Sequence, residues 1–120
     1  MVALAVALGG AAGSLLRWGL GLLGEGQSWP WTTLGINVAG SLLAGAMAQW
    51  GAARLPEIVS TGIIAGVLAG FTTFSAFSVQ TVALATDGRA WAATAYVAAS
   101  VVLGIAAGWV GVLIGQRMTA

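Results

Sequence analysis

Three long stretches of the sequence contain no charged residue. They cover residues 26–53, 58–86 and 90–116, and each exceeds the roughly 20 residues that a helix needs to cross the hydrocarbon core of a bilayer. A fourth apolar stretch, about residues 2–23, is interrupted only by Arg17 near its far end, where a long side chain can extend toward the interface. We therefore expect an all-α membrane protein that forms a single domain of four transmembrane helices. Their expected bounds are about residues 2–23, 32–53, 58–86 and 90–116.

The composition agrees with insertion into a membrane and excludes several classes of function. Of the 120 residues, 59% are hydrophobic and 6% are charged, whereas roughly 25% of the residues of a soluble domain are charged. The sequence contains no Cys and no His, so it cannot form a Cys/His metal site or use a thiol nucleophile or a histidine base. A net charge of +1 gives no reason to expect a nucleic acid as a partner.

The expected turns between the spans are short. The stretch WPW at 29–31 places tryptophans at the level of the membrane interface and a proline at a helix start. The stretches ARLPE at 53–57 and TDGRAW at 86–91 carry turn chemistry. These turns leave no room for a domain outside the membrane.

The distribution of arginines bears on orientation, because positive charge sets the topology of a membrane protein. With four helices, Arg54 and Arg117 lie on one side, and Arg89 lies on the other with Arg17 directed toward it. The count is two against two, which leaves two interpretations open. Either the charges are too few to define one orientation, or copies insert both ways and pair antiparallel, as in a dual-topology dimer.

Many of the nineteen glycines stand four residues apart, as at Gly9 and Gly13 or at Gly62, Gly66 and Gly70. This spacing puts small residues on one helix face and lets helix backbones approach closely. Four helices of this length enclose little of a pathway alone, so we also expect an oligomer.

Polar side chains inside the expected spans are few, and such groups usually face the protein interior or a water-filled path. None is an Asp or a Glu. A proton-coupled transporter generally needs a titrating carboxylate at membrane depth, and a membrane hydrolase needs an acid/base pair or an activated nucleophile. Both classes are therefore disfavoured, and the hydrogen-bond donors that remain suit an anion. They are Ser14, Arg17, Asn37, Thr72, Thr73, Ser75, Ser78, Gln80, Thr94, Tyr96 and Ser100.

The stretch GFTTFSAFSVQ at 70–80 interleaves hydroxyls with phenylalanines. A phenyl ring has a positive edge, so rings presented edge-on can approach a small anion. Phe74 and Phe77 are three residues apart and lie on neighbouring parts of one helix face.

The third span is longer than a bilayer requires, and AGFTT at 69–73 is weak in helix propensity. We therefore expect a break near the middle of this helix, whose freed carbonyls must line a cavity or meet a cation. The alternative is an intact, tilted helix whose hydroxyls bond back to the preceding turn.

Three motifs carry a resemblance to a known family. They are GGAAGSLLRW at 9–18, TLGINVAGS at 33–41 and GFTTFSAFS at 70–78. These motifs and their order resemble those of the Fluc-type fluoride channels, the CrcB family. The chain length and the helix layout are also similar, and the resemblance extends over essentially the whole chain. The resemblance implies a fluoride exporter of the bacterial plasma membrane that is not an enzyme. It also implies an antiparallel dimer in the lipid bilayer, with two fluoride pores and a central sodium ion at the dimer interface.

The resemblance also implies roles for individual residues. Phe74 and Phe77 would be the ring-edge pair beside the fluoride path, with each subunit contributing rings to both pores, and Asn37 would donate a hydrogen bond to the ion. Each has a simpler alternative, because rings pack and amides join helices. The other residues of the implied pore are Thr73 and Ser75, near the break, and Tyr96 and Ser100, one turn apart.

The sodium ion would be held by the backbone carbonyls of Ala69 and Thr72 from both subunits. Arg17 would lie near a pore vestibule, unless it only anchors its helix at the interface. For Tyr96, packing is an equally open alternative.

The sequence departs from the family pattern at three positions. Gln80 stands where an acidic residue is expected, Gly104 where the polar track often continues with a hydroxyl, and Ala69 where a glycine is usual. Pairing with a paralogue as a heterodimer is an alternative to the homodimer. The competing functions are a small coupled exporter of organic cations or other solutes, and a membrane assembly subunit that transports nothing.

Overall fold

The computed structural model describes all 120 residues, and every regular element in it is a helix. The all-α expectation is therefore confirmed. In chain order the elements are α1 (Val2–Gly21), a 3₁₀ turn η1 (Leu22–Gly24), α2 (Trp31–Arg54), α3 (Glu57–Thr61), a π-helical segment η2 (Gly62–Leu68), α4 (Ala69–Phe71), α5 (Phe74–Thr86) and α6 (Ala90–Thr119).

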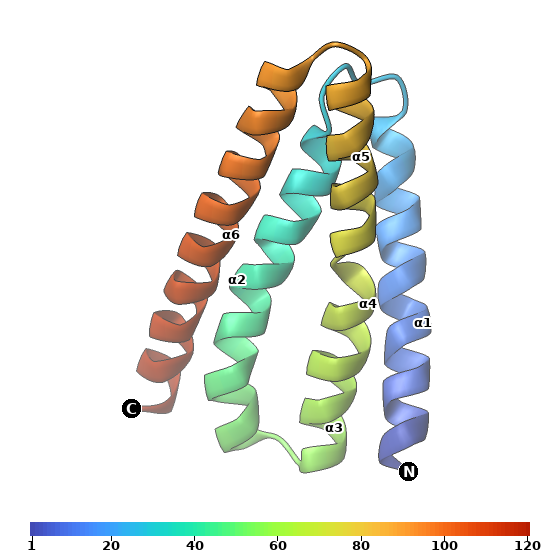
Figure 1. Cartoon of the computed structure of the whole chain (residues 1–120). Coiled ribbons are helices and arrows are strands. Elements are labelled where there is room, and N and C mark those ends of the chain that lie inside the picture. Colours follow the sequence, from blue (N-terminus) through green and yellow to red (C-terminus); the bar gives the residue numbers. More distant parts are fainter.

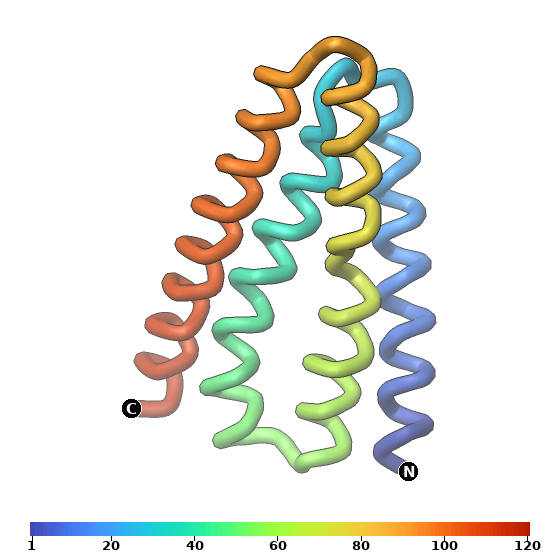
Figure 2. Tube along the Cα trace, viewed as in Figure 1, coloured from blue at the N-terminus to red at the C-terminus, as the bar shows by residue number.

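The helices run up and down beside one another (Figures 1 and 2). α3, η2, α4 and α5 follow one another along a single rod that is interrupted between α4 and α5. α2 packs chiefly against α6, while α1 packs against η2 and α4. Both chain ends lie at the same end of the bundle as the α2–α3 turn (Figure 1).

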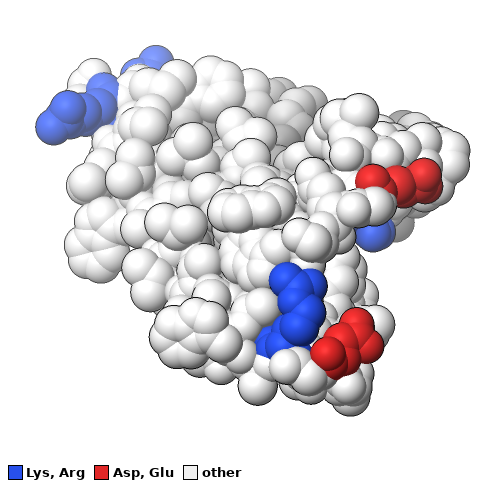
Figure 3. Space-filling model, turned by 90° about the horizontal axis from the view of Figure 1, so that it is seen from above, with Lys and Arg blue, Asp and Glu red and all other residues white.

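Three helical segments are long and apolar enough to cross a membrane: Val2–Gly24, Glu57–Thr86 and Ala90–Thr119. α2 has 24 residues and is less apolar. Only 15 residues of the chain are buried, and many large apolar side chains face outward. Seen from above, the charged side chains form a few small groups on an otherwise uncharged surface (Figure 3). Such a surface suits lipid, and the chain is a multi-pass membrane protein.

Glycines bring the backbones together along two seams. A Cβ added at Gly13 of α1 would overlap the carbonyl oxygen of Val67 in η2, and one added at Gly45 of α2 would overlap that of Gly108 in α6. The close packing expected from the glycine spacing is thus present within the chain. The π-helical form of η2 was not expected from the sequence.

At each end of the bundle, one arginine bonds to a backbone carbonyl. At the end that holds the chain termini, Arg54 Nη2 donates to the carbonyl oxygen of Thr119 at 3.4 Å. At the opposite end, Arg89 Nη1 donates to the carbonyl oxygen of Ser28. The Arg89 contact joins the loop 25–30 to the start of α6.

Candidate functional site

The candidate site surrounds a helix break at Thr72 and Thr73. Both residues are extended, with φ/ψ of −81°/157° and −150°/116°. Thr73 is the N-cap of α5, because its hydroxyl accepts a hydrogen bond from the backbone N–H of Ala76 at 3.1 Å. The expected interruption of the third span is therefore present, and helix α5 begins immediately after it.

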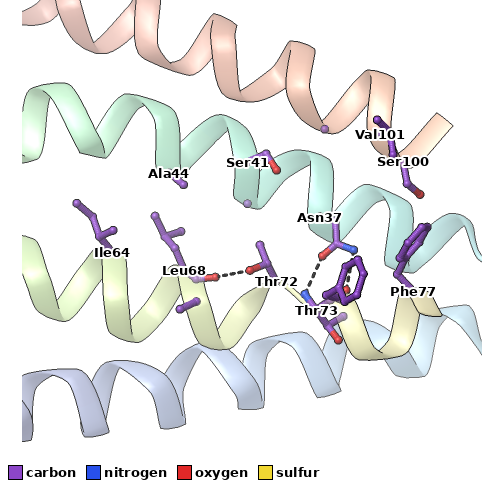
Figure 4. A pocket seen from close by; sticks show the side chains of 14 residues that line it. Asn37, Ser41, Ala44, Ile64, Leu68, Thr72, Thr73, Phe77, Ser100 and Val101 are labelled. Atoms are coloured by element: carbon purple, nitrogen blue, oxygen red, sulfur yellow. Dashed lines mark hydrogen bonds between the residues drawn. The ribbon is translucent and has the colours of Figure 1, made fainter. Parts of the chain in front are cut away.

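Asn37 of α2 pairs with the backbone of Thr73 across the interface between the two helices. The Thr73 N–H donates to Asn37 Oδ1 at 2.8 Å, and Asn37 Nδ2 donates to the Thr73 carbonyl at 3.0 Å (Figure 4). Only one orientation of the amide satisfies both bonds, which fixes the assignment of its oxygen and nitrogen. The side-chain amide thus takes the place of a helical peptide partner for Thr73.

Arg17 of α1 reaches the other side of the break. Its Nε donates to the carbonyl oxygen of Gly70 at 3.0 Å, a carbonyl that the break leaves without its partner in the next helical turn. A cation at this position also faces the negative end of the helix dipole. The sequence predicts Arg17 near a vestibule or at the interface, and it does not predict this contact.

The break leaves three carbonyls free. Thr72 donates both its N–H and its hydroxyl to the Leu68 carbonyl, each at 3.0 Å. No hydrogen bond reaches the carbonyls of Ala69, Phe71 or Thr72. Unpaired carbonyls at this depth need a partner other than lipid.

Phe74 and Phe77 lie directly after the break. Their ring centroids are 5.6 Å apart with an interplanar angle of 46°. The Phe74 side chain is 79% exposed, whereas Phe77 is half-buried and packs against the Tyr96 ring in a T-shaped arrangement at 5.2 Å. The Phe77 ring is therefore held in place by its contact with α6, whereas the Phe74 ring projects outward.

Gln80 belongs to a hydrogen-bonded chain that joins three helices. The hydroxyl of Tyr96, which is fully buried, donates to Gln80 Oε1 at 2.8 Å. Gln80 Nε2 in turn donates to Thr33 Oγ1 of α2 at 3.0 Å. Thr33 was not among the residues expected at the site. Its position four residues before Asn37 was a usable signal, because residues four apart share a helix face.

An open groove with a volume of about 440 Å³ runs beside the break. It brings together most of the site residues expected from the sequence, and its polar groups are mainly amides, hydroxyls and carbonyls. Ser100 Oγ is buried here without a hydrogen-bond partner. Ser75, Tyr96, Gln80 and Arg17 lie outside the lining. The expected residues that line the groove are Asn37, Ala69, Thr72, Thr73, Phe74, Phe77 and Ser100 (Figure 4).

Closely packed apolar helices, interrupted by a polar break that opens into a groove, define a helical membrane protein of the channel or transporter class. The family described as "CrcB-like protein, Camphor Resistance (CrcB)" matches residues 4–112 of the sequence. This chain belongs to the CrcB family.

Several bacterial relatives are similar over nearly the whole chain. A "Fluoride-specific ion channel FluC" of Hyphomonas neptunium is 40% identical over 123 residues, covering 98% of this chain and 97% of the relative. The protein of the same name from Rhodospirillum rubrum is 44% identical over 118 residues, with 92% of both chains covered. "Fluoride-specific ion channel FluC 1" of Nitrobacter hamburgensis is 46% identical over 109 residues, which is 87% of this chain and 86% of the relative.

Proposed function

We propose that this chain is the subunit of a fluoride-selective channel, and not an enzyme, that exports fluoride passively across the bacterial plasma membrane. The observation that carries the proposal is the position of Phe74 and Phe77 at a groove whose lining contains no charged residue. The names of the relatives support the choice of fluoride as the ion.

A small, strongly hydrated anion needs several positive contacts to leave water. Ring edges of Phe74 and Phe77 supply weak ones. Asn37 Nδ2 supplies a stronger one, because an amide carries two hydrogens and only one of them is used by the Thr73 carbonyl. The hydroxyls of Thr73 and Ser75 bond to each other at 3.3 Å, so the one that accepts in this bond would add a further donor near the break.

The remaining residues would act on the same path from α6, α5 and α1. Ser100 Oγ, buried and unpaired, is a free donor, while Tyr96 and Gln80 would support the Phe77 ring through their hydrogen bond. Arg17 would hold the break beside the pore entrance through the Gly70 carbonyl.

We propose that the subunit is a single domain of four transmembrane helices, with α2 as the fourth span, and that two copies form an antiparallel homodimer. The support is the open groove and the outward Phe74 ring, which a second copy would cover. The balance of Arg54 and Arg117 against Arg17 and Arg89 agrees with insertion in both orientations. Pairing with a paralogue as a heterodimer is the alternative.

A sodium ion at the dimer interface would bind carbonyls that the break leaves without hydrogen bonds. The carbonyls of Ala69 and Thr72 accept no hydrogen bond and belong to residues that line the groove, and carbonyl oxygens are suitable ligands for a hard cation. Two subunits would provide two pairs of such carbonyls. The ion would neutralise the negative helix end at α4.

The proposal is tested by reconstituting the purified protein in liposomes loaded with fluoride and chloride. A potassium gradient with valinomycin allows an uncoupled anion to leave, and two ion-selective electrodes follow its release. Fluoride release that depends on valinomycin, without chloride release, is expected. Proton-coupled uptake of an organic cation, or no transport of either anion, contradicts the channel assignment.

A further inference from the structure

Several hydroxyls on the helices bond to their own backbone. Ser78, Thr81 and Thr94 each donate to the carbonyl four residues earlier, at 2.8–2.9 Å, which is the common arrangement in apolar surroundings. Ser41 of α2 and Ser100 of α6 do not, and both line the groove at the break. A free hydroxyl at this depth is costly unless it meets a ligand.

Ser41 follows Asn37 by one helical turn, so both side chains lie on the same face of α2. On the facing helix, Tyr96, Ser100 and Gly104 follow one another at the same spacing. Gly104 has no side chain to continue this row, and the position that its Cβ would take is 4.0 Å from Ser41 Oγ, with no other atom outside its own helix backbone that close. The Ser41 hydroxyl thus lies close to where the next side chain of this row would begin, but it comes from α2 on the opposite side of the groove.

We propose that Ser41 is a further residue of the anion path, where its hydroxyl donates to the permeating ion one step beyond Asn37. The inference rests on the proposed fluoride channel. It assigns to α2 a contact that α6 cannot make in this chain because residue 104 is a glycine. Ser41 and Asn37 both line the groove from α2 (Figure 4), so an ion in the groove could approach both side chains.

The first test compares fluoride efflux for Ser41→Ala and Ser41→Thr with that of the unmodified channel in liposomes. Ser41→Ala is expected to lower efflux about tenfold, the order expected for the loss of one hydrogen bond to a charged group. Ser41→Thr keeps the hydroxyl and is expected to stay within about twofold. Equal efflux for Ser41→Ala and the unmodified channel overturns the proposal.

The second test moves the hydroxyl to the opposite wall. Adding Gly104→Ser to Ser41→Ala is expected to restore most of the efflux, because a serine at 104 starts from the point beside Ser41 Oγ. The matched control, Gly104→Ala in the same background, fills the same space without a hydroxyl and is expected to restore nothing. Equal recovery with both variants means that packing, and not donation, is restored, and this result rejects the assignment.

Sodium provides a third comparison, because the carbonyls of Ala69 and Thr72 belong to the same groove. The Ser41→Ala defect is expected to persist when sodium is raised. A defect that disappears at high sodium means that the Ser41 oxygen serves a cation, which contradicts the proposal. An unmodified channel that conducts no fluoride rejects the proposed function itself, whereas a conducting one with unaffected Ser41→Ala rejects only the role of Ser41.

Discussion

Asn37 and Thr73 form a reciprocal pair in which one side-chain amide bonds to both the N–H and the carbonyl of one backbone residue. Because an asparagine amide has the same donor and acceptor as a peptide group, α2 replaces at Thr73 the hydrogen bonds that a continuous helix would have made. The break is therefore held in one conformation by a specific side chain, and the adjoining rings are placed with it.

Replacing Asn37 with aspartate is expected to reduce fluoride efflux by at least about tenfold, equivalent to about 1.4 kcal/mol in the barrier. The carboxylate can still accept from the Thr73 N–H but cannot donate to the Thr73 carbonyl, and its charge repels an anion. Efflux from liposomes measures the effect. Gln49→Glu is the matched control, because it makes the same amide-to-carboxylate change on α2 outside the groove. Unchanged efflux for Asn37→Asp removes Asn37 from the pore.

Replacing Phe74 with isoleucine is expected to lower fluoride efflux by at least about tenfold, while the protein purifies in the same oligomeric state. The ring is 79% exposed, so little packing is lost, and the change removes mainly the positive ring edge. Trp109→Ile serves as control, because Trp109 is 70% exposed on α6 and does not line the groove. If both variants conduct equally well, Phe74 has no contact with the ion.

The bond between Tyr96 and Gln80 is expected to appear as an energetic coupling. Tyr96→Phe and Gln80→Leu should each destabilise the protein, and the double variant should be more stable than their sum by about 0.5–1.5 kcal/mol. Unfolding in detergent, followed by circular dichroism, measures the cycle. As a control cycle, Tyr96→Phe is combined with Thr94→Val, because Thr94 bonds only within its own helix. Additivity in both cycles contradicts the bond.

The backbones of α1 and η2 are expected to pack too closely to accommodate even one added methyl group. Gly13→Ala should lower the free energy of unfolding by about 1–3 kcal/mol, the usual cost of overpacking, because its Cβ would overlap the Val67 carbonyl. A Cβ added at Gly19 on the same helix would meet no atom of a neighbouring segment within 4 Å. Gly19→Ala should therefore be neutral or stabilising by up to about 1 kcal/mol. Equal melting temperatures for the two variants would refute the seam.

The sequence was sufficient to predict the helical class and the break in the third span. Asn37, Phe74 and Phe77, which it singled out as pore residues, line the groove beside that break. Charge and helix propensity are local properties, and the spans and the weak segment 69–73 follow from them. Polar residues in apolar spans are few enough to stand out, whereas Phe74 and Phe77 were singled out through the motif GFTTFSAFS.

Other features depend on packing between distant segments. Arg17 finds the Gly70 carbonyl only because α1 lies against η2 and α4, and no local pattern distinguishes this partner from the interface. The π-helical turns of Gly62–Leu68 likewise arise where glycines on two helices meet. Thr33 and Ser41 could have been predicted from the sequence, because both stand four residues from Asn37.

The two side chains from other helices that bond to the backbone at the break, Arg17 and Asn37, both precede it in the chain. A growing polypeptide emerges from its N-terminus, so α1 and α2 are synthesised before Gly70 and Thr73 must leave water. The backbone groups of Gly70 and Thr73 can therefore enter the bilayer with their partners already synthesised. A circular permutation that places α1 or α2 after the break in the chain would remove this advantage. The first expected effect is less efficient insertion into the membrane during synthesis.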